Sequence, residues 1–173
     1  MKELSMTKPF LVYTGNLYPH KNVDILVLAV EKLKINLAIV CARSVFEKRL
    51  PASPYAHYLG RLSDPELINL YHNALAFVFP SLIEGFGLPG LEAMSTGLPV
   101  IAARASCLPE IYGEAALYFD PYIVNDLVAK IQSILSDPKL RKSLIAKGYR
   151  QAQKYSWAKM ANETWQIYQK ELH

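Results

Sequence analysis

Short apolar runs alternate with longer segments of helical periodicity along almost the whole chain, and this alternation limits the fold more than any other feature of the sequence. The strand-like runs are residues 10–14, 37–41, 57–59, 76–79, 99–102 and 116–119. Nearly continuous apolar character is typical of strands buried on both faces, as in parallel sheets covered by helices. The order therefore predicts an α/β fold, a Rossmann-like parallel sheet with helices on both faces.

The remaining segments are expected to be helical. Apolar spacing and helix-start signals predict helices at residues 23–34, 64–73, 109–112, 123–135, 138–155 and 156–172, with one more beginning near Pro89. Asp64 is expected as the N-cap of its helix, with Pro65 at the first helical position. The last helices form a helical C-terminal tail. Because no repeat or linker interrupts the pattern, residues 1–173 are expected to form a single domain.

Composition excludes several classes of protein. A chain of 173 residues with 51% hydrophobic and 20% charged residues is typical of a soluble globular domain. No apolar run approaches the roughly 20 residues that span a bilayer, and the N-terminus lacks the apolar core of a signal peptide, so a cytoplasmic location is expected. Cys41 and Cys107 are far apart and lack nearby metal-ligating residues, which predicts neither a disulfide framework nor a zinc site.

The net charge of +4 is modest, and much of it lies on the helical segment 138–155. A solvated helix face is one interpretation. A peripheral contact with anionic lipid at the inner membrane face is the other. Nucleic-acid binding is not predicted, because the basic residues are not interleaved with aromatic ones in a binding-module pattern. The residues concerned are Lys139, Arg141, Lys142, Lys147, Arg150 and Lys154.

The most informative segment for function is residues 80–94, which follows the strand-like run 76–79. Gly85 and Gly87 predict a tight turn, and Pro89 suits the first turn of a helix. Backbone N–H groups at such a turn are free to bind a phosphate or diphosphate. Glu84 and Glu92 bracket the turn and, being repelled by phosphate, are expected to accept hydrogen bonds from hydroxyl groups. A ligand that has hydroxyl groups on either side of its phosphates is a nucleotide-sugar.

This segment resembles the donor-site signature of retaining GT-B glycosyltransferases of the family 4 type. The resemblance rests on two glutamates separated by seven residues, with Gly-Phe-Gly-Leu-Pro after the first and Glu-Ala-Met at the second. It implies that Glu84 is the catalytic residue that fixes the donor sugar and that Glu92 binds the ribose. The backbone of residues 85–88 (Gly85, Phe86, Gly87 and Leu88) would bind the diphosphate. An ordinary strand–turn–helix with surface glutamates is the alternative.

The turn after the first strand, residues 15–22, supplies the other candidates. Lys21 lies where the chain enters the first long helix, at the carboxyl edge of the sheet, where it can neutralise a diphosphate or remain a solvated lysine. The resemblance implies donor contacts at Gly15, Asn16 and Lys21. Many family members have an arginine where this chain has Asn16, and His20 stands where a related pattern has arginine.

Three further loops resemble family loops near the donor. Residues 60–64 contain Arg61 and Leu62, which the resemblance places at the nucleotide base, although Arg61 also fits an ordinary exposed loop arginine. Residues 81–83 are expected to be buried support for Glu84. Residues 105–110 resemble a loop beside the donor site, and Glu110 is interpreted as a helix-start carboxylate.

The resemblance covers roughly residues 10–168 and corresponds to the donor-binding, C-terminal domain of a GT-B enzyme. The acceptor-binding N-terminal domain is therefore expected to be absent, and the partner to be such a half or a second copy of this chain. The C-terminal helix has an apolar face, part of which is expected to pack on the domain's own sheet layer and part to meet the partner. That face comprises Trp157, Met160, Ala161, Thr164, Trp165 and Tyr168.

The implied function is retaining transfer of a mannosyl or glucosyl residue from a nucleotide-diphosphate sugar to a glycan or lipid-linked acceptor, as in cell-surface polysaccharide biosynthesis. No cofactor and no metal are expected, because a helix N-terminus and Lys21 supply positive potential. The alternative is a non-catalytic module that binds nucleotide-sugar or docks to a partner. A flavodoxin-like domain would leave the paired glutamates unexplained.

Overall fold

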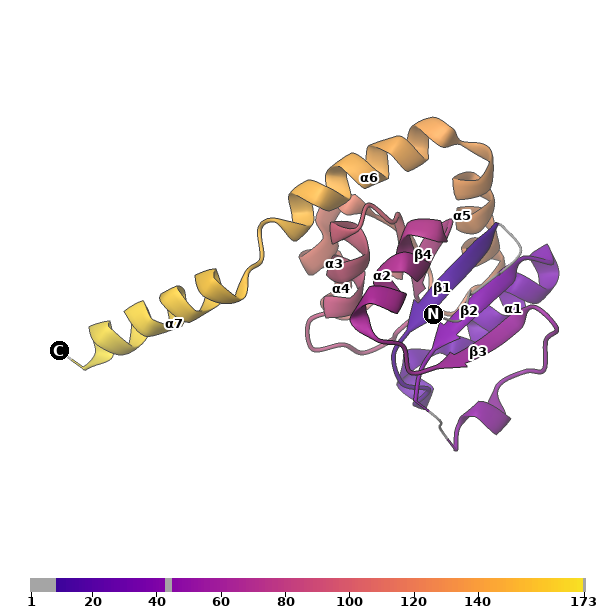
Figure 1. Ribbon diagram of the computed structural model, residues 1–173, viewed down its shortest axis with the longest axis horizontal. Coiled ribbons are helices and arrows are strands. Elements are labelled where there is room, and N and C mark those ends of the chain that lie inside the picture. The colour runs from indigo at the N-terminus through magenta and orange to yellow at the C-terminus, as the bar shows by residue number, and fades with distance from the viewer. Residues whose placement is uncertain (1–8, 43–44, 173) are drawn as a thin grey trace.

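The computed structural model describes residues 9–42 and 45–172, and its centre is one parallel sheet of six strands in the order β3-β2-β1-β4-β5-β6 (Figure 1). The predicted parallel sheet is confirmed, and no expected strand is displaced by more than about one residue at either end. The strands are β1 (Phe10–Thr14), β2 (Asn36–Val40), β3 (Ala56–Gly60), β4 (Ala76–Phe79), β5 (Val100–Ala103) and β6 (Ala116–Phe119).

Helices cover both faces of this sheet, which confirms the Rossmann-like architecture. Right-handed connections place the helix after β1 on one face and the helices after β3, β4 and β5 on the other. Within these layers α1 packs against α5, and α3 packs against α6. The helices are α1 (Val23–Leu33), α2 (Asp64–Asn73), α3 (Leu88–Ser95), α4 (Leu108–Tyr112), α5 (Val124–Ser136), α6 (Pro138–Ala152) and α7 (Trp157–Glu171). Short 3-10 turns occupy η1 (Pro19–Lys21), η2 (Glu47–Arg49) and η3 (Gly113–Ala115).

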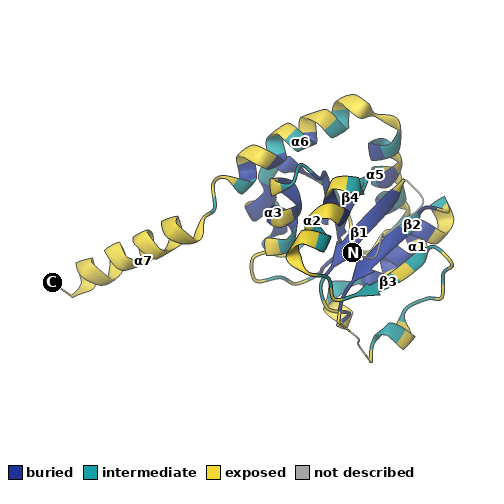
Figure 2. Ribbon diagram, viewed as in Figure 1, coloured by how far each residue is buried: buried dark blue, intermediate teal, exposed yellow. Residues whose placement is uncertain are grey.

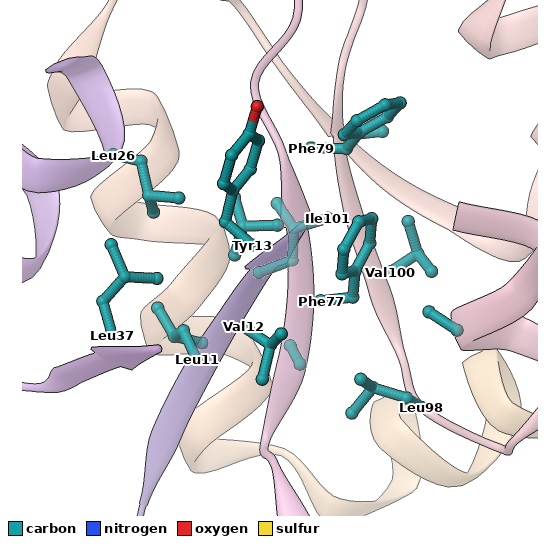
Figure 3. Close-up of a cluster of buried hydrophobic side chains, with 14 of the residues drawn as sticks. Leu11, Val12, Tyr13, Leu26, Leu37, Phe77, Phe79, Leu98, Val100 and Ile101 are labelled. Atoms are coloured by element: carbon teal, nitrogen blue, oxygen red, sulfur yellow. The ribbon is translucent and has the colours of Figure 1, made fainter. Parts of the chain in front are cut away.

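The core is formed by the central strands and the helix faces that pack on them (Figure 3). Every residue of β1, β4 and β5 is buried, so these strands show no alternation of polar and apolar residues. In the register, Leu11 of β1 lies opposite Leu37 on one side and Ala76 on the other. The rings of Phe77 and Phe79 pack at a centroid distance of 5.6 Å. A rigid core therefore holds the carboxyl ends of β1 and β4.

The strand order reverses between β1 and β4, and this reversal positions the candidate site. From β1 the chain moves outward to β2 and β3, then returns to β4 on the other side of β1 and continues outward to β5 and β6. The loops after β1 and β4 therefore leave the sheet in opposite directions. In open α/β sheets a crevice for ligands lies at such a point, outside the carboxyl ends of the strands.

Two predicted helix ends are wrong. The N-cap of α2 is Ser63, not Asp64, and its N–H and hydroxyl both donate to the Glu66 carboxylate, at 2.9 and 2.6 Å. This arrangement resembles a capping box, and it makes Asp64 the first helical residue. At the other end of the chain, α6 stops at Ala152 rather than at residue 155, because the chain turns there before Ser156 caps α7.

Helix α7 extends away from the rest of the protein, and all of its residues are exposed (Figure 2). The prediction that part of its apolar face packs on the domain's own sheet layer is therefore wrong. The chain is last anchored at Tyr155, whose hydroxyl donates to the Ile111 carbonyl at 3.3 Å, and α7 begins two residues later. Within the described part of the chain, no helix is both long enough and apolar enough to cross a membrane.

Candidate functional site

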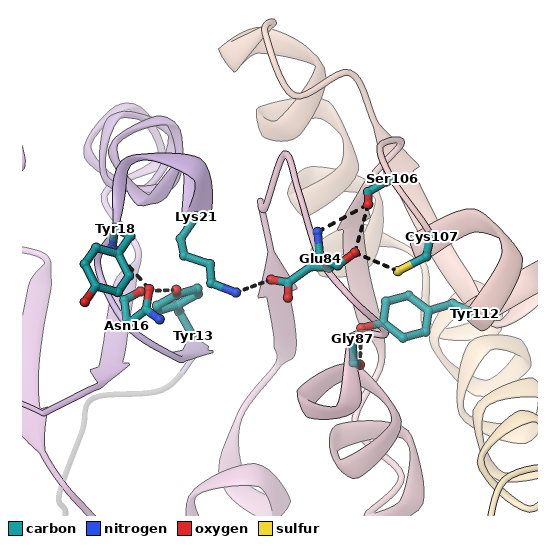
Figure 4. Close-up of polar contacts among 9 residues, drawn as sticks. All are labelled: Tyr13, Asn16, Tyr18, Lys21, Glu84, Gly87, Ser106, Cys107 and Tyr112. Carbon is teal, nitrogen blue, oxygen red and sulfur yellow. Dashed lines mark hydrogen bonds and ion pairs between the residues drawn. The ribbon is translucent and has the colours of Figure 1, made fainter. Parts of the chain in front are cut away.

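The loops after β1 and β4 meet through an ion pair at the strand switch point (Figure 4). Lys21 is the last residue of η1, and Glu84 lies in the loop between β4 and α3. The Lys21 Nζ lies 2.5 Å from the Glu84 Oε1, with only 14% and 11% of the two side chains exposed. The Lys21 Nζ also lies 5.8 Å from the centre of the Phe79 ring. The sequence predicted Lys21 and Glu84 as site residues on two different loops, and the structure shows that they contact each other.

Backbone contacts fix this pair from both loops. The Leu82 N–H donates to the His20 carbonyl at 2.8 Å, which ties the loop after β4 to η1. Beyond Lys21, Asn22 adopts a left-handed conformation with φ of 53° and donates its side-chain amide to the Pro121 carbonyl at 2.9 Å. His20 therefore contributes through its backbone, and its ring stacks on Tyr18 at a centroid distance of 6.0 Å.

The turn at Gly15 and Asn16 is built around the buried Tyr13. The Tyr13 hydroxyl donates to the Asn16 carbonyl at 2.6 Å, and the Asn16 Oδ1 accepts from the Tyr18 N–H at 3.2 Å. Gly15 has φ of 146°, and a Cβ there would lie 2.8 Å from the Tyr13 hydroxyl oxygen. Burial, together with the nearby Glu84 carboxylate, raises the pKa of Tyr13, so its hydroxyl stays a donor. In this structure the Asn16 side chain stabilises its own turn.

The turn into α3 requires glycine at position 87 for steric reasons. Gly87 is the N-cap of α3 with φ of 89°, and a Cβ there would lie 2.6 Å from the Tyr112 hydroxyl oxygen. Pro89 lies in the first turn, as predicted. Gly85 has open space where a side chain would be. No hydrogen bond from the N–H groups of residues 86, 87 or 88 is found among the described residues, so these donors remain available.

Gly90 of α3 and Tyr112 of α4 support this turn, and the sequence did not reveal either role. The Tyr112 hydroxyl donates to the Gly87 carbonyl at 2.5 Å, and a Cβ at Gly90 would lie 2.3 Å from the same hydroxyl oxygen. Tyr112 is fully buried. A signal for this contact was present in the sequence, because Gly90 lies inside a helix, where glycine lowers helix stability and therefore indicates close packing. The partner of that glycine could not be identified from the chain alone.

The Glu92 carboxylate interacts electrostatically with Asp64, the residue that follows the loop that the sequence placed at the nucleotide base. It sits one to two turns into α3 and is open to solvent, but desolvation by the surrounding protein raises its pKa, and the Asp64 carboxylate adds a smaller effect in the same direction. Asp64 directly follows the 60–63 loop, in which Arg61 is exposed and Leu62 is half-buried. A partly desolvated carboxylate near a second one is a strong acceptor for ligand hydroxyls.

Two other expectations are only partly correct. Ser81 is fully buried, as predicted for the segment before Glu84, but Ile83 is 66% exposed because the loop turns outward there. On α6, Arg141 does not belong to a solvated basic face, since its Nη1 donates to the Ile134 and Leu135 carbonyls. Helix α6 still presents exposed lysines, including Lys139, on its outer side.

No cluster of three His, Cys, Asp or Glu side chains suited to a metal ion occurs among residues 9–42 and 45–172. The cationic elements of the site itself are the Lys21 ammonium and the N-terminus of α3, which carries a partial positive charge. Both lie at the carboxyl edge of the sheet, next to the Glu84 carboxylate. Together they offer positive potential for an anionic group and carboxylates for neighbouring hydroxyls.

Comparison with known proteins gives a consistent result. The family model "Glycosyl transferases group 1" matches residues 2–151. The chain is 34% identical over 172 residues to O-antigen chain mannosyltransferase B of Escherichia coli, covering 92% of this chain and 45% of that protein. The chain thus spans less than half the length of this curated relative.

Solved structures agree with the fold. Sucrose-phosphate synthase from Thermosynechococcus elongatus superposes with a TM-score of 0.82 at 28% identity, over 95% of this chain and 45% of that one. Anabaena HepE, solved in complex with UDP and glucose, superposes with a TM-score of 0.80 over 92% of this chain and 48% of its own. At 20% identity the second likeness concerns the fold alone.

Proposed function

The chain belongs to the group 1 glycosyl transferases, and from this premise we propose that it binds a nucleotide-diphosphate sugar as the donor for glycosyl transfer. The transferred group in this proposal is a mannosyl or glucosyl residue, and the acceptor is a glycan or a lipid-linked sugar. The mannosyltransferase relative supports the first choice, and the HepE complex with UDP and glucose supports a nucleotide donor at this fold.

The observation that carries the proposal is the Lys21–Glu84 pair beside the N-terminus of α3. In an unliganded site the two side chains neutralise each other at 2.5 Å. A donor diphosphate would take the Lys21 ammonium and the unpaired N–H groups of Phe86, Gly87 and Leu88. Glu84 would then be released to accept hydrogen bonds from the hydroxyls of the transferred sugar. Lys21 and Glu84 would thus give up their ion pair and bind the diphosphate and the sugar of one ligand.

The nucleoside end of the donor would extend toward α2. Glu92 would accept hydrogen bonds from the ribose hydroxyls, and the 60–62 loop with Arg61 and Leu62 would contact the base. The electrostatic interaction of Glu92 with Asp64 supports this placement, because Asp64 directly follows that loop. The arrangement runs from Glu84 through the α3 N-terminus to the loop after β3.

The proposed reaction is transfer with retention of configuration. The bond between the anomeric carbon and the phosphate oxygen breaks, and the acceptor oxygen bonds to the same face of that carbon. The leaving diphosphate takes the acceptor proton, so no protein nucleophile is required. Lys21 and the α3 N-terminus stabilise the charge that builds on the diphosphate, and Glu84 holds the sugar in place. The proposal uses no metal ion and no cofactor.

Catalysis in this proposal requires an acceptor-binding half, which would cover the donor site at the carboxyl edge of the sheet. Separately, the fully exposed apolar face of α7 favours a partner, either such a half or a second copy of the chain. The same observation favours the alternative function, a non-catalytic module that holds nucleotide-sugar or docks to a partner. We further propose a cytoplasmic location with peripheral contact of the α6 lysines with anionic lipid.

Calorimetric titration with UDP, GDP, UDP-glucose and GDP-mannose tests the donor role. Glu92→Ala should weaken binding of nucleotide diphosphates with and without the sugar, whereas Glu84→Ala should weaken only the sugar-bearing ligands. Glu163→Ala on the exposed helix α7 is the control and should change neither. Equal losses for both ligand types in both site variants would refute the assigned roles. Adding EDTA should leave every affinity unchanged.

A further inference from the structure

The segment between β5 and α4 forms hydrogen bonds with the backbone of Glu84 (Figure 4). The Ser106 Oγ accepts a hydrogen bond from the Glu84 N–H at 3.2 Å and donates one to the Glu84 carbonyl at 3.0 Å. The Cys107 thiol donates to the same carbonyl at 3.4 Å. One side chain from a distant loop therefore occupies both backbone polar groups of the residue that pairs with Lys21.

Among residues 9–42 and 45–172, no other hydrogen bond to the Glu84 backbone is found. Ile83, before it, is 66% exposed, and Gly85, after it, has open space in place of a side chain. The other anchors in the loop are the Leu82 N–H on the His20 carbonyl, the Phe86 ring on Tyr155 at a centroid distance of 5.3 Å, and the Tyr112 hydroxyl on the Gly87 carbonyl. Rotation of the Glu84 backbone would break both Ser106 bonds, so Ser106 sets the direction in which the Glu84 carboxylate leaves the loop.

The conformation of Ser106 points to the same role. Its φ is 53°, in the left-handed region that serine rarely adopts and that glycine or asparagine would adopt more readily. Strained residues of this kind persist where the surrounding structure requires them, and they cluster at functional sites. Ser106 is exposed, so it does not fill the core. What serine provides here, and glycine would not, is the hydroxyl that bridges Glu84.

We propose that Ser106 is a positioning residue that aims the Glu84 carboxylate at the transferred sugar. The inference rests on the proposed function, since it assigns Glu84 to the donor sugar. Ser106 is expected to affect recognition of the sugar and to leave recognition of the diphosphate to Lys21 and the α3 N-terminus. It acts through Glu84, so its contribution should vanish when the Glu84 carboxylate is removed.

Ser106→Gly isolates the hydroxyl, because glycine keeps the left-handed conformation without strain. The measurement is the ratio of affinities for UDP-glucose and UDP, and for GDP-mannose and GDP, by calorimetry on the whole chain. For the donor that the wild type binds, loss of two neutral hydrogen bonds should lower the sugar-bearing affinity by about tenfold and change the bare diphosphate by less than about twofold. Ser106→Asn restores a donor and an acceptor at this conformation and should recover part of the loss.

A double-mutant cycle with Glu84→Ala separates positioning from general destabilisation. In the Glu84→Ala background, Ser106→Gly should cause no further loss of sugar-bearing affinity. Hydrogen exchange of the Glu84 amide should be faster in Ser106→Gly than in the wild type, because its acceptor is gone. Losses that are equal for both ligand types, or additive in the cycle, would overturn the inference.

The two proposals fail in different ways. A wild-type chain that binds none of the four nucleotides would refute the proposed function, and the positioning role with it. A wild-type chain that prefers a sugar-bearing ligand, combined with a Ser106→Gly variant that keeps the same preference, would overturn the positioning role alone. An unchanged exchange rate of the Glu84 amide in that variant would show that the Ser106 bridge is not formed in solution.

Discussion

The Lys21–Glu84 pair makes a quantitative prediction about stability that needs no ligand. At 2.5 Å and an effective dielectric constant of about 20, the direct attraction is about 7 kcal/mol. Desolvation of the two ions costs several kcal/mol each, so the net contribution of the intact pair is small. Removing one partner has a larger effect, because it leaves the other charge largely buried without compensation.

The perturbation is a cycle of Lys21→Met, Glu84→Gln and the double variant. A fully buried pair loses about 3–5 kcal/mol when one partner is removed. Since 14% and 11% of these side chains remain exposed, we expect each single variant to lose about 2 kcal/mol of unfolding free energy. The double variant should lose only about 1 kcal/mol, which gives a coupling free energy of about 3 kcal/mol.

Urea unfolding followed by circular dichroism measures these free energies. The matched control is the ion pair of Lys130 and Asp126 on α5, whose atoms are 3.3 Å apart with 31% of each side chain exposed. Its coupling should stay below about 0.5 kcal/mol, as for other solvated pairs four residues apart on a helix. A coupling for Lys21 and Glu84 no larger than this control would refute the buried pair and return Lys21 to the solvated surface.

Three other predictions test the site and its surroundings. Desolvation and Asp64 raise the pKa of Glu92, so UDP affinity should begin to fall on acidification at a pH above the ordinary carboxyl range. The unfolding free energy of the wild type, relative to that of Glu92→Gln, should decline as the pH rises through the raised pKa. Calorimetry and urea titrations between about pH 4 and 8 check both. Gly90→Ala should lose about 1–3 kcal/mol in urea unfolding because its Cβ would overlap the buried Tyr112 hydroxyl, whereas an alanine at the open position 85 should change stability by less than about 0.5 kcal/mol. The α7 face should produce self-association by light scattering, or binding to a separately supplied acceptor half, and Trp165→Gln should abolish either. A monomeric chain that transfers sugar unaided would contradict the last prediction.

The amino-acid sequence by itself determined the elements and their order. Period and composition are local properties, so the buried strands, the helix starts and the turn into α3 could be predicted to within a few residues. The motif around Glu84 and Glu92 was recognisable for the same reason, since all its parts lie within one strand–turn–helix unit. The errors in the elements themselves occurred at helix ends, as at the start of α2, where the competing caps Ser63 and Asp64 are adjacent in sequence.

Only the tertiary structure decided which distant residues meet. Lys21 and Glu84 are 63 residues apart, and Ser106 and Glu84 are 22 apart, so neither contact leaves a local signal. The same holds for Gly90, whose lack of a side chain is explained only by the Tyr112 hydroxyl beside it.

Helix α7 shows the limit of sequence reasoning most clearly. Its amphipathic pattern predicted an apolar face, but the pattern cannot say what that face contacts. The structure shows the face exposed to solvent along its whole length. The physical reason is general: periodicity depends on neighbours along the chain, whereas contacts depend on how layers pack, and packing is set by the whole chain at once.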